Sequence, residues 1–235
     1  MSRDAASPNY VIENLSCPCS VMRFYLVYRG QLSATQGKRG ARRAERVEIR
    51  KQITPQLKRL WEVNGALTRL LWDARVPGPA AGGFMATVSS PLEEWYNSPP
   101  QYPPQKGFVD LTSPIERHGR KYMPLVRKSL DLTCSLNVLF LRQEDPGSLL
   151  KKAGDLDNRI KTFIDALEMP PEEAEGDETD GLNYCLLEND SLVRGLEIDS
   201  ERLLLPELDY PNQVHLIVEV VVHVERVGSW NVCLL

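Results

Sequence analysis

The strongest constraint on the fold is the alternation of apolar and polar residues between Leu130 and Leu141. Successive side chains of a β-strand point to opposite faces, so this spacing predicts a strand with one buried and one more polar face. The range Val214–Val224 has apolar residues at every even position, and Arg23–Gly30 repeats the alternation over a shorter length. We therefore expect a β-sheet to which these three segments contribute strands.

Helical spacing separates these strands. Ala41–Ile53 is a polar, charged helical pattern, and Pro55 is expected to start a second helix because proline fits the first turn of a helix. Before Pro170, apolar residues recur at intervals of three and four, which predicts a helix against the sheet: Ile160, Phe163, Ile164 and Leu167. A short strand is expected near Leu186–Leu196. The order β-α-β-α-β-β predicts an α/β (α+β) fold with helices packed on a mixed β-sheet.

Composition divides the 235 residues into four segments. Residues 1–22 are expected to be an N-terminal extension, and residues 23–75 hold the first strand and the basic helices of the core domain. A Pro- and aromatic-rich insertion is expected over 76–128, and the remainder of the core domain over 129–235. The last segment includes an acidic loop, 168–180, which contains seven acidic and no basic residues. One core domain with an insertion fits this length.

Several classes of protein are disfavoured by composition. No apolar run approaches the roughly 18 residues of a membrane span, and the first residues lack the pattern of a secretory signal. The five cysteines have no spacing typical of disulfide frameworks, and the three histidines form no set with metal-ligand spacing. We expect a cytoplasmic protein with no membrane partner.

The net charge of −4 conceals a strongly basic segment. Between Arg23 and Arg59 eleven basic residues face two acidic ones, which gives this segment a charge of +9. Clustered cations of this kind bind the phosphates of nucleic acids. The candidate phosphate contacts are Lys38, Arg39, Arg42, Arg43, Arg46, Arg50, Lys151 and Lys152.

Asp155 and Asp157 stand immediately before the expected helix. If they lie in extended chain, their carboxylates point to the same side, and crowded carboxylates favour a bound cation such as Mg²⁺. Lys161, four residues after Asp157, is then placed to steady a phosphate group. The alternative is that either aspartate caps the helix, because Asp is a preferred N-cap residue. Spacing alone slightly favours the cap.

The full motif resembles the signature of the RusA family of Holliday-junction resolvases. Its first block is Asp155-Leu-Asp-Asn-Arg-Ile-Lys-Thr-Phe-Ile-Asp-Ala-Leu, and its second is Glu188-Asn-Asp-Ser-Leu-Val. The resemblance implies that Asp155, Asp157 and Asp190 bind Mg²⁺, with Mn²⁺ as a substitute, and that Lys161 is needed for cleavage. It implies secondary roles for Asp165 and Glu188. Asn189 stands where the family has an acidic residue, and Lys151 and Lys152 stand where it has a run of arginines.

This resemblance implies a Mg²⁺-dependent, structure-selective endonuclease that hydrolyses phosphodiester bonds in branched DNA and acts as a homodimer. Two other classes stay open. The chain is alternatively a non-catalytic protein that binds nucleic acid on a similar fold, or a regulatory protein whose acidic loop occupies its own cleft. Metal-dependent cleavage separates the enzyme from both.

Overall fold

The computed structural model describes residues 22–33, 39–73, 75–77, 108–143, 155–171, 181–205, 213–227 and 231–235. Most of the expected N-terminal extension, the Pro-rich stretch 78–107 and the acidic residues 172–180 lie outside the described residues. Of the acidic loop expected over 168–180, the structure therefore describes only residues 168–171.

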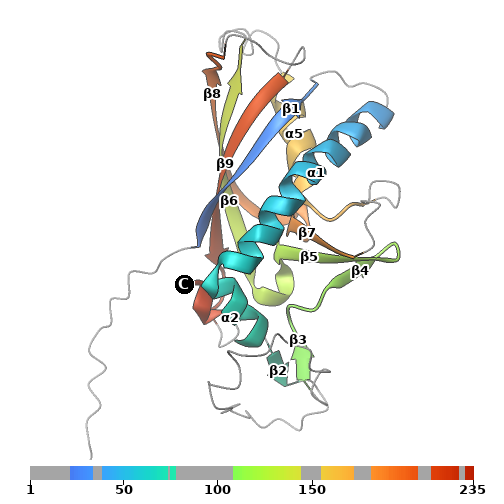
Figure 1. The fold of residues 1–235 in the computed structure, drawn as a ribbon. Coiled ribbons are helices and arrows are strands. Elements are labelled where there is room, and N and C mark those ends of the chain that lie inside the picture. The colour runs from blue at the N-terminus through green and yellow to red at the C-terminus, as the bar shows by residue number, and fades with distance from the viewer. Residues whose placement is uncertain are drawn as a thin grey trace, which may run out of the picture.

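A four-stranded mixed sheet forms the centre of the described structure (Figure 1). In spatial order its strands are β1 (Arg23–Gln31), β9 (Gln213–Val224), β6 (Leu132–Arg142) and β8 (Val193–Arg202). Strand β9 is antiparallel to both neighbours, while β6 and β8 are parallel. The three alternating segments are confirmed as strands, and the fold is confirmed as a mixture of helices and mixed β-sheet.

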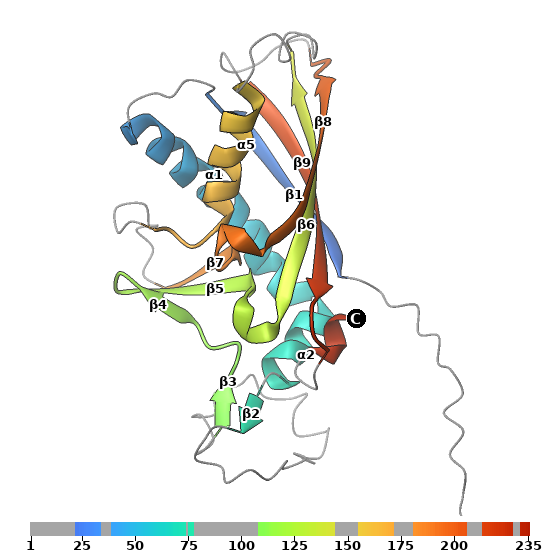
Figure 2. The ribbon, with the colours of Figure 1, turned by 180° about the vertical axis from the view of Figure 1, so that it is seen from behind.

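Two helices, α1 (Arg39–Val63) and α5 (Asp155–Leu167), lie on the same side of this sheet (Figures 1 and 2). The even-numbered residues of β6 are buried beneath them, and the odd-numbered ones are only partly buried. Burial of apolar surface between sheet and helices supplies the main driving force for this arrangement. None of the described helices combines the length and the apolar composition of a membrane span.

Helix α1 is continuous, so the expectation of two helices separated at Pro55 is wrong. Proline in a helix interior removes one backbone hydrogen bond and is normally unfavourable. The helix continues because packing compensates: Ile49, Ile53, Leu57 and Trp61 recur every four residues and are all buried.

The break between helices occurs nine residues later, at Asn64. Its Oδ1 accepts the N–H groups of Ala66 and Leu67 at 2.9 and 3.1 Å, and so caps helix α2 (Gly65–Asp73). The second helix therefore starts at a residue whose side chain accepts the free N–H groups of its first turn. A proline side chain has no acceptor and cannot do this.

A second, three-stranded sheet packs against the same core. It contains β4 (Ile115–Arg117), β5 (Arg120–Val126) and β7 (Leu182–Leu187), with β5 and β7 parallel. The strand expected near Leu186–Leu196 is wrong as a single element. The chain instead leaves β7, forms the short turn η4 (Asp190–Leu192) and enters β8 in the other sheet.

The described part of the expected insertion carries regular structure that the sequence pattern did not predict. Strands β2 (Arg75–Pro77) and β3 (Phe108–Asp110) form a ribbon, and Leu125 and Val126 of β5 belong to the core. Pro124 lies inside β5, so the proline content of this range concealed the strand. Two short 3₁₀ turns, η2 (Lys128–Leu130) and η5 (Val232–Leu234), complete the described elements.

Two glutamines of α1 cover the outer edge of β1. Gln56 accepts the N–H of Val27 at 2.9 Å and donates to its carbonyl at 2.7 Å. One helical turn earlier, Gln52 makes the same pair of bonds with Arg29, at 3.1 and 2.9 Å. These amides take the place of a neighbouring strand, which protects an edge that would otherwise pair with another chain.

We expect Gln56→Ala to lower the free energy of unfolding by about 1–2 kcal/mol, because two backbone groups of Val27 lose their partners. Urea denaturation measures this effect. Lys51→Ala is the matched control, since Lys51 is exposed on the same helix, and a change within about 0.5 kcal/mol is expected. Equal stabilities for the two variants would contradict a role of Gln56 in covering the edge.

Candidate functional site

Asp155 and Asp157 lie in the first turn of α5, so the extended chain that would point both carboxylates to one side is not formed, and both positions are at the helix start, as in the alternative interpretation. Residues two apart in an α-helix do not face each other, so the local backbone does not bring these positions to one point. The side chain of Asp155 lies outside the described part of the chain, and Asp157 is exposed.

The other polar residues of the motif follow one side of α5. Asp157, Lys161 and Asp165 are spaced by four residues, which aligns them along the helix. Asp157 and Lys161 are exposed and Asp165 is partly buried. The opposite side of the helix is buried in the core through Ile160 and Phe163. The helix therefore presents an acidic and a basic group to solvent.

The second motif block forms the turn η4, with Asp190 as its first residue. The N–H of Asp190 donates to Oε2 of Glu168, directly after the end of α5, at 3.2 Å. Asn189 accepts the N–H of Ser191 at 2.9 Å and so caps the turn. Its amide supplies the capping oxygen that an aspartate would also supply, which accounts for Asn at this position.

Glu168 connects the two blocks and was placed only in the acidic loop by the sequence analysis. Burial raises the pKa of its carboxyl above the ordinary value of 4.5, and the charges of Asp190 and Asp165 raise it further. The N–H of Asp190 and the charge of Arg50 act in the opposite direction. Its position one turn after Asp165, just before Pro170, was the available signal that it continues the motif face.

The structure thus joins Asp190 to Glu168, whose carboxyl is also affected by the charge of Asp165, but the contacts of this group do not include Asp157. Asp157 lies ten residues before the end of α5, or about 15 Å of helical rise. Among the described residues, which exclude the Asp155 side chain, no three carboxylate, imidazole or thiol groups converge closely enough to hold a metal ion.

The raised pKa of Glu168 predicts a pH-dependent effect of Glu168→Gln. The folded state disfavours the charged carboxylate, so the parent loses stability as the pH rises from about 4.5 through the raised pKa. Glutamine cannot ionise and still accepts a hydrogen bond. Urea denaturation at several pH values should show the variant gaining stability relative to the parent as the pH rises above about 4.5. A difference that does not change with pH would contradict this environment.

Glu188, expected to have a secondary role, has structural partners. Its Oε2 accepts the N–H of Lys128 at 2.9 Å, and its own N–H donates to the carbonyl of Val126 at 2.9 Å. These bonds fix the end of β7 beside the start of η2. They direct Glu188 toward the backbone and not toward Glu168.

The basic residues of α1 divide into two kinds. Arg46 forms an ion pair with Asp165 at 3.9 Å, and Arg50 donates to the backbone carbonyl of Asp165 at 2.9 Å. Arg50 is only 5% exposed, so its guanidinium attaches α1 to α5 and is not presented to a ligand.

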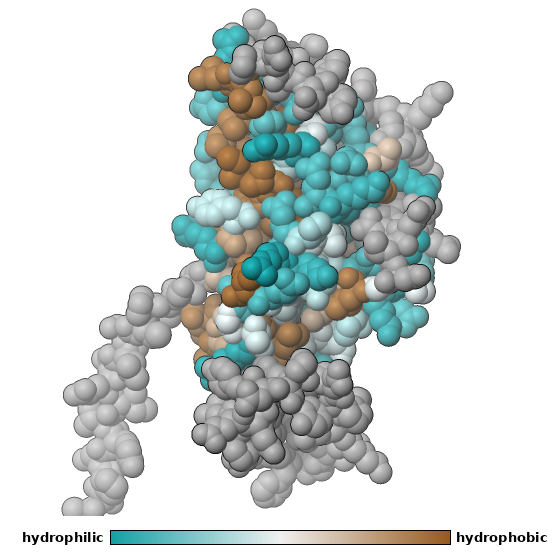
Figure 3. Space-filling view, in the orientation of Figure 1, coloured by the Kyte–Doolittle hydropathy of each residue, from teal (hydrophilic) through white to brown (hydrophobic). Residues whose placement is uncertain are grey.

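Arg42 and Arg43 lie nearer the start of α1, where Arg43 is exposed and Arg42 is partly exposed. In Figure 3 much of the visible surface of this side of the molecule is hydrophilic. Arg39 begins α1, but its side chain is not described, and Lys38, Lys151 and Lys152 lie outside the described residues.

The two motif blocks therefore meet at the C-terminal end of α5, beside a basic helix. Comparison of the chain with protein-family models, with curated proteins and with solved structures finds no match. The likeness to the RusA family is carried by the motif residues alone.

Proposed function

We propose that the protein is a Mg²⁺-dependent, structure-selective endonuclease that hydrolyses phosphodiester bonds in branched DNA in the cytoplasm, in the manner of RusA-type resolvases. The observation that supports this most is the contact between the two motif blocks. Asp190 follows the first block by more than twenty residues, yet its N–H bonds to Glu168, the residue directly after that block and its helix. Two blocks of one site need such proximity.

Carboxylates are the ligands that a hard divalent cation prefers. Mg²⁺ is commonly held by one or two carboxylates together with waters and phosphate oxygens. By the resemblance, Asp155, Asp157 and Asp190 hold it; by the described contacts, Glu168 is the acid bonded to Asp190, and the charge of Asp165 acts on Glu168. Asp190 belongs to both arrangements.

When bound, such an ion activates water and stabilises the leaving oxygen of the phosphodiester. Lys161 is exposed on the motif side of α5 and can contact a phosphate oxygen without first breaking a buried contact. Arg46 and Arg50 hold α1 against α5 through Asp165, which keeps the basic helix beside the site. Asp165 therefore acts as a positioning residue, consistent with its expected secondary role.

Substrate choice is tested with a synthetic four-way junction and a linear duplex of the same sequence. With Mg²⁺ the protein should cut the junction and leave the duplex intact, because the activity is proposed to recognise branched geometry. Equal cleavage of both substrates would contradict structure selectivity, and cleavage of neither would contradict the nuclease proposal.

The basic segment of α1 is expected to bind the DNA backbone. Arg42→Glu together with Arg43→Glu should weaken junction binding about tenfold or more at low salt, independent of sequence, and flatten its salt dependence. Lys58→Glu with Arg59→Glu is the matched control at the other end of α1 and should change the affinity much less. Fluorescence anisotropy measures both. Equal effects of the two pairs would place the DNA elsewhere.

A further inference from the structure

Strand β8 is an edge strand with outward-pointing backbone groups. It is the last strand of the four-stranded sheet, and β6 occupies its inner side (Figures 1 and 2). The N–H of Leu203 bonds to the carbonyl of Arg142 on β6 at 2.6 Å, and in a parallel pair every second residue continues this pattern. The odd-numbered residues of β8 therefore bond to β6. The N–H and C=O groups of its even-numbered residues point outward: Leu196, Ile198, Ser200 and Arg202.

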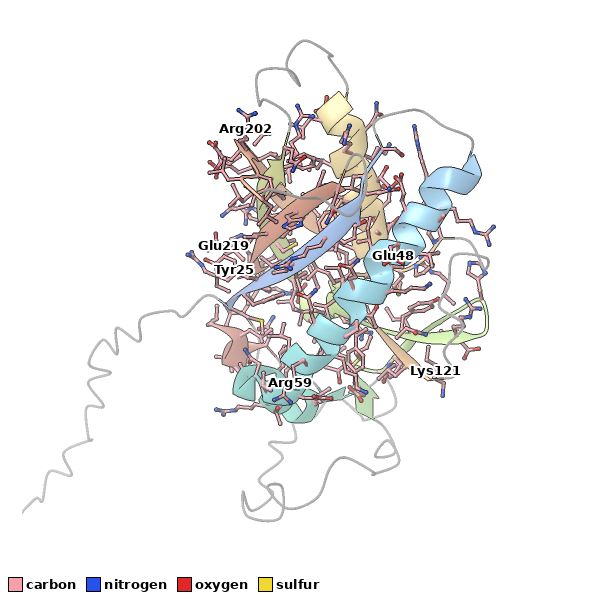
Figure 4. The ribbon with its side chains drawn as sticks, turned by 45° about the horizontal axis from the view of Figure 1, so that its top comes forward. Tyr25, Glu48, Arg59, Lys121, Arg202 and Glu219 are labelled. Carbon is pink, nitrogen blue, oxygen red and sulfur yellow. The ribbon has the colours of Figure 1, made fainter. Side chains whose placement is uncertain are left out.

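Within the described part of the chain, no hydrogen bond joins these outward groups to another element. The opposite edge of the same sheet differs, since Gln52 and Gln56 of α1 bond to the backbone of β1. Figure 4 shows Arg202, at the end of β8, on the outside of the molecule. A strand edge with unpaired N–H and C=O groups is a template for a further strand.

Three carboxylates follow this edge on one face of the sheet. Glu197, Asp199 and Glu201 are all exposed and point to the side away from α1 and α5, because they are register neighbours of the odd-numbered residues of β6. Among the described residues, none forms a hydrogen bond or an ion pair with these three side chains. The edge therefore carries a row of negative charge with the two-residue period of a strand.

The central carboxylate of the same face is compensated within the chain. Glu219 accepts hydrogen bonds from Tyr25 at 2.9 Å and from Asn137 at 2.7 Å, and pairs with Arg23 at 3.1 Å. Figure 4 shows Tyr25 and Glu219 next to each other. The lack of such partners is thus a property of the β8 edge and not of the whole face.

The other side of the β8 edge is apolar. Leu196 and Ile198 point to the side of the helices, where Leu196 is 45% exposed and Ile198 is partly buried. Leu204, directly after the strand, is 85% exposed. Exposed apolar side chains beside unpaired backbone groups are characteristic of an interaction site. A strand added here would therefore lie beside carboxylates on one face and beside apolar side chains on the other.

We propose that the outer edge of β8 binds an extended segment of a partner protein in which basic and apolar residues alternate. Such a segment bonds to the outward backbone groups of Ile198 and Ser200 and extends the sheet by one strand. Its alternate side chains point to opposite faces, so its Lys or Arg residues lie beside the three carboxylates and its apolar residues lie beside Leu196 and Ile198.

The same charges disfavour a second copy of this chain at this edge. Antiparallel pairing of two β8 strands would place their rows of carboxylates against each other, and like charges directly opposite are destabilising. A basic segment has the complementary charge, which favours this partner and speeds its association. The inference goes beyond the proposed nuclease activity, and its test needs neither DNA nor Mg²⁺.

A synthetic peptide of alternating lysine and valine, about ten residues long like β8, tests the proposal. Fluorescence anisotropy of the labelled peptide should show saturable binding to the full chain at micromolar concentrations. A peptide of the same composition, with its lysines in one block and its valines in another, should bind at least about tenfold more weakly, because it cannot present one charge at every second position. Equal binding of the two peptides, or binding of neither, would overturn the proposal.

Charge reversal tests the acidic row. Glu197→Lys together with Asp199→Lys should weaken binding of the lysine–valine peptide about tenfold or more and strengthen binding of a glutamate–valine peptide. Glu62→Lys with Glu116→Lys is the matched control, since both residues are exposed acids on other elements. It should change the affinity much less. Equal losses in the two double variants would place the peptide elsewhere and contradict the inference.

Hydrogen exchange followed by NMR locates the bound peptide on the strand edge. With the lysine–valine peptide present, the amides of Leu196, Ile198 and Ser200 should exchange at least about tenfold more slowly, because each gains a partner. Binding without this protection would show attraction by charge alone and would overturn strand addition. Protection that rises with protein concentration in the absence of peptide would assign the edge to a second copy and would also overturn the proposal.

Discussion

Asp190→Asn is expected to reduce Mg²⁺-dependent cleavage of a four-way junction by about 1,000-fold or more. The substitution keeps the shape of the side chain and the backbone N–H that bonds to Glu168. It removes the charge that would hold the cation, and a catalytic metal ion supplies several kcal/mol of transition-state stabilisation, which corresponds to about this factor. Single-turnover cleavage with saturating protein measures the rate, and anisotropy under Ca²⁺ checks that the DNA still binds.

Two further substitutions distinguish the alternative ligand sets. If the resemblance gives the correct ligands, Asp157→Asn should be as inactive as Asp190→Asn, and Glu168→Gln should retain most activity. If Glu168 and Asp190 hold the ion, Glu168→Gln should be inactive and Asp157→Asn should retain most activity. Glu188→Gln is the control and should keep near-parent rates, because Glu188 bonds to the backbone of Lys128. Near-normal cleavage by Asp190→Asn would contradict both sets.

The largest loss of stability is expected from Phe163→Ala, which should lower the free energy of unfolding by about 3–5 kcal/mol. Phe163 is fully buried in the core, and its ring lies 6.2 Å from that of Tyr28 at a tilted angle of 45°. Removing the ring leaves a cavity between α5 and β1 and deletes an aromatic contact. Because α5 carries Asp157 and Lys161, cleavage should fall together with stability.

Chemical denaturation followed by circular dichroism checks this prediction. Ile164→Ala on the same helix is the matched comparison, since Ile164 is only partly buried and should cost less. If Phe163→Ala unfolds before purification, Phe163→Leu gives a smaller loss that is still measurable. A Phe163 variant as stable as the parent would contradict the packing of α5 against the sheet.

The strands and the motif helix were predictable because each carries its own periodic signal. The burial of β6 alternates strictly, β9 has apolar residues at every even position, and α5 combines apolar residues at helical spacing with a proline stop. The continuity of α1 was not predictable, since a local rule at Pro55 is outweighed by the burial of Ile53 and Leu57. Nor was β5, whose Pro124 gives the segment the composition of a loop.

The candidate site was predictable only in part, because local sequence patterns do not show which distant residues come into contact. The motif identifies Asp157, Lys161 and Asp190 locally, but the contact between Glu168 and Asp190 spans 22 residues and depends on how β7 returns to the end of α5. The buried position of Arg50 likewise depends on its partner in another helix. A count of charges along the chain shows neither the contact between Glu168 and Asp190 nor the burial of Arg50.

The most direct test of the proposed function is a Mg²⁺ titration of junction cleavage by the parent, with Asp190→Asn purified identically as the blank. We predict that the parent cuts the junction in proportion to bound Mg²⁺ and stops on addition of a chelator, while the variant stays inactive at every concentration. Metal-dependent cleavage at the same rate in both preparations would show that the activity does not come from this site and would contradict the account.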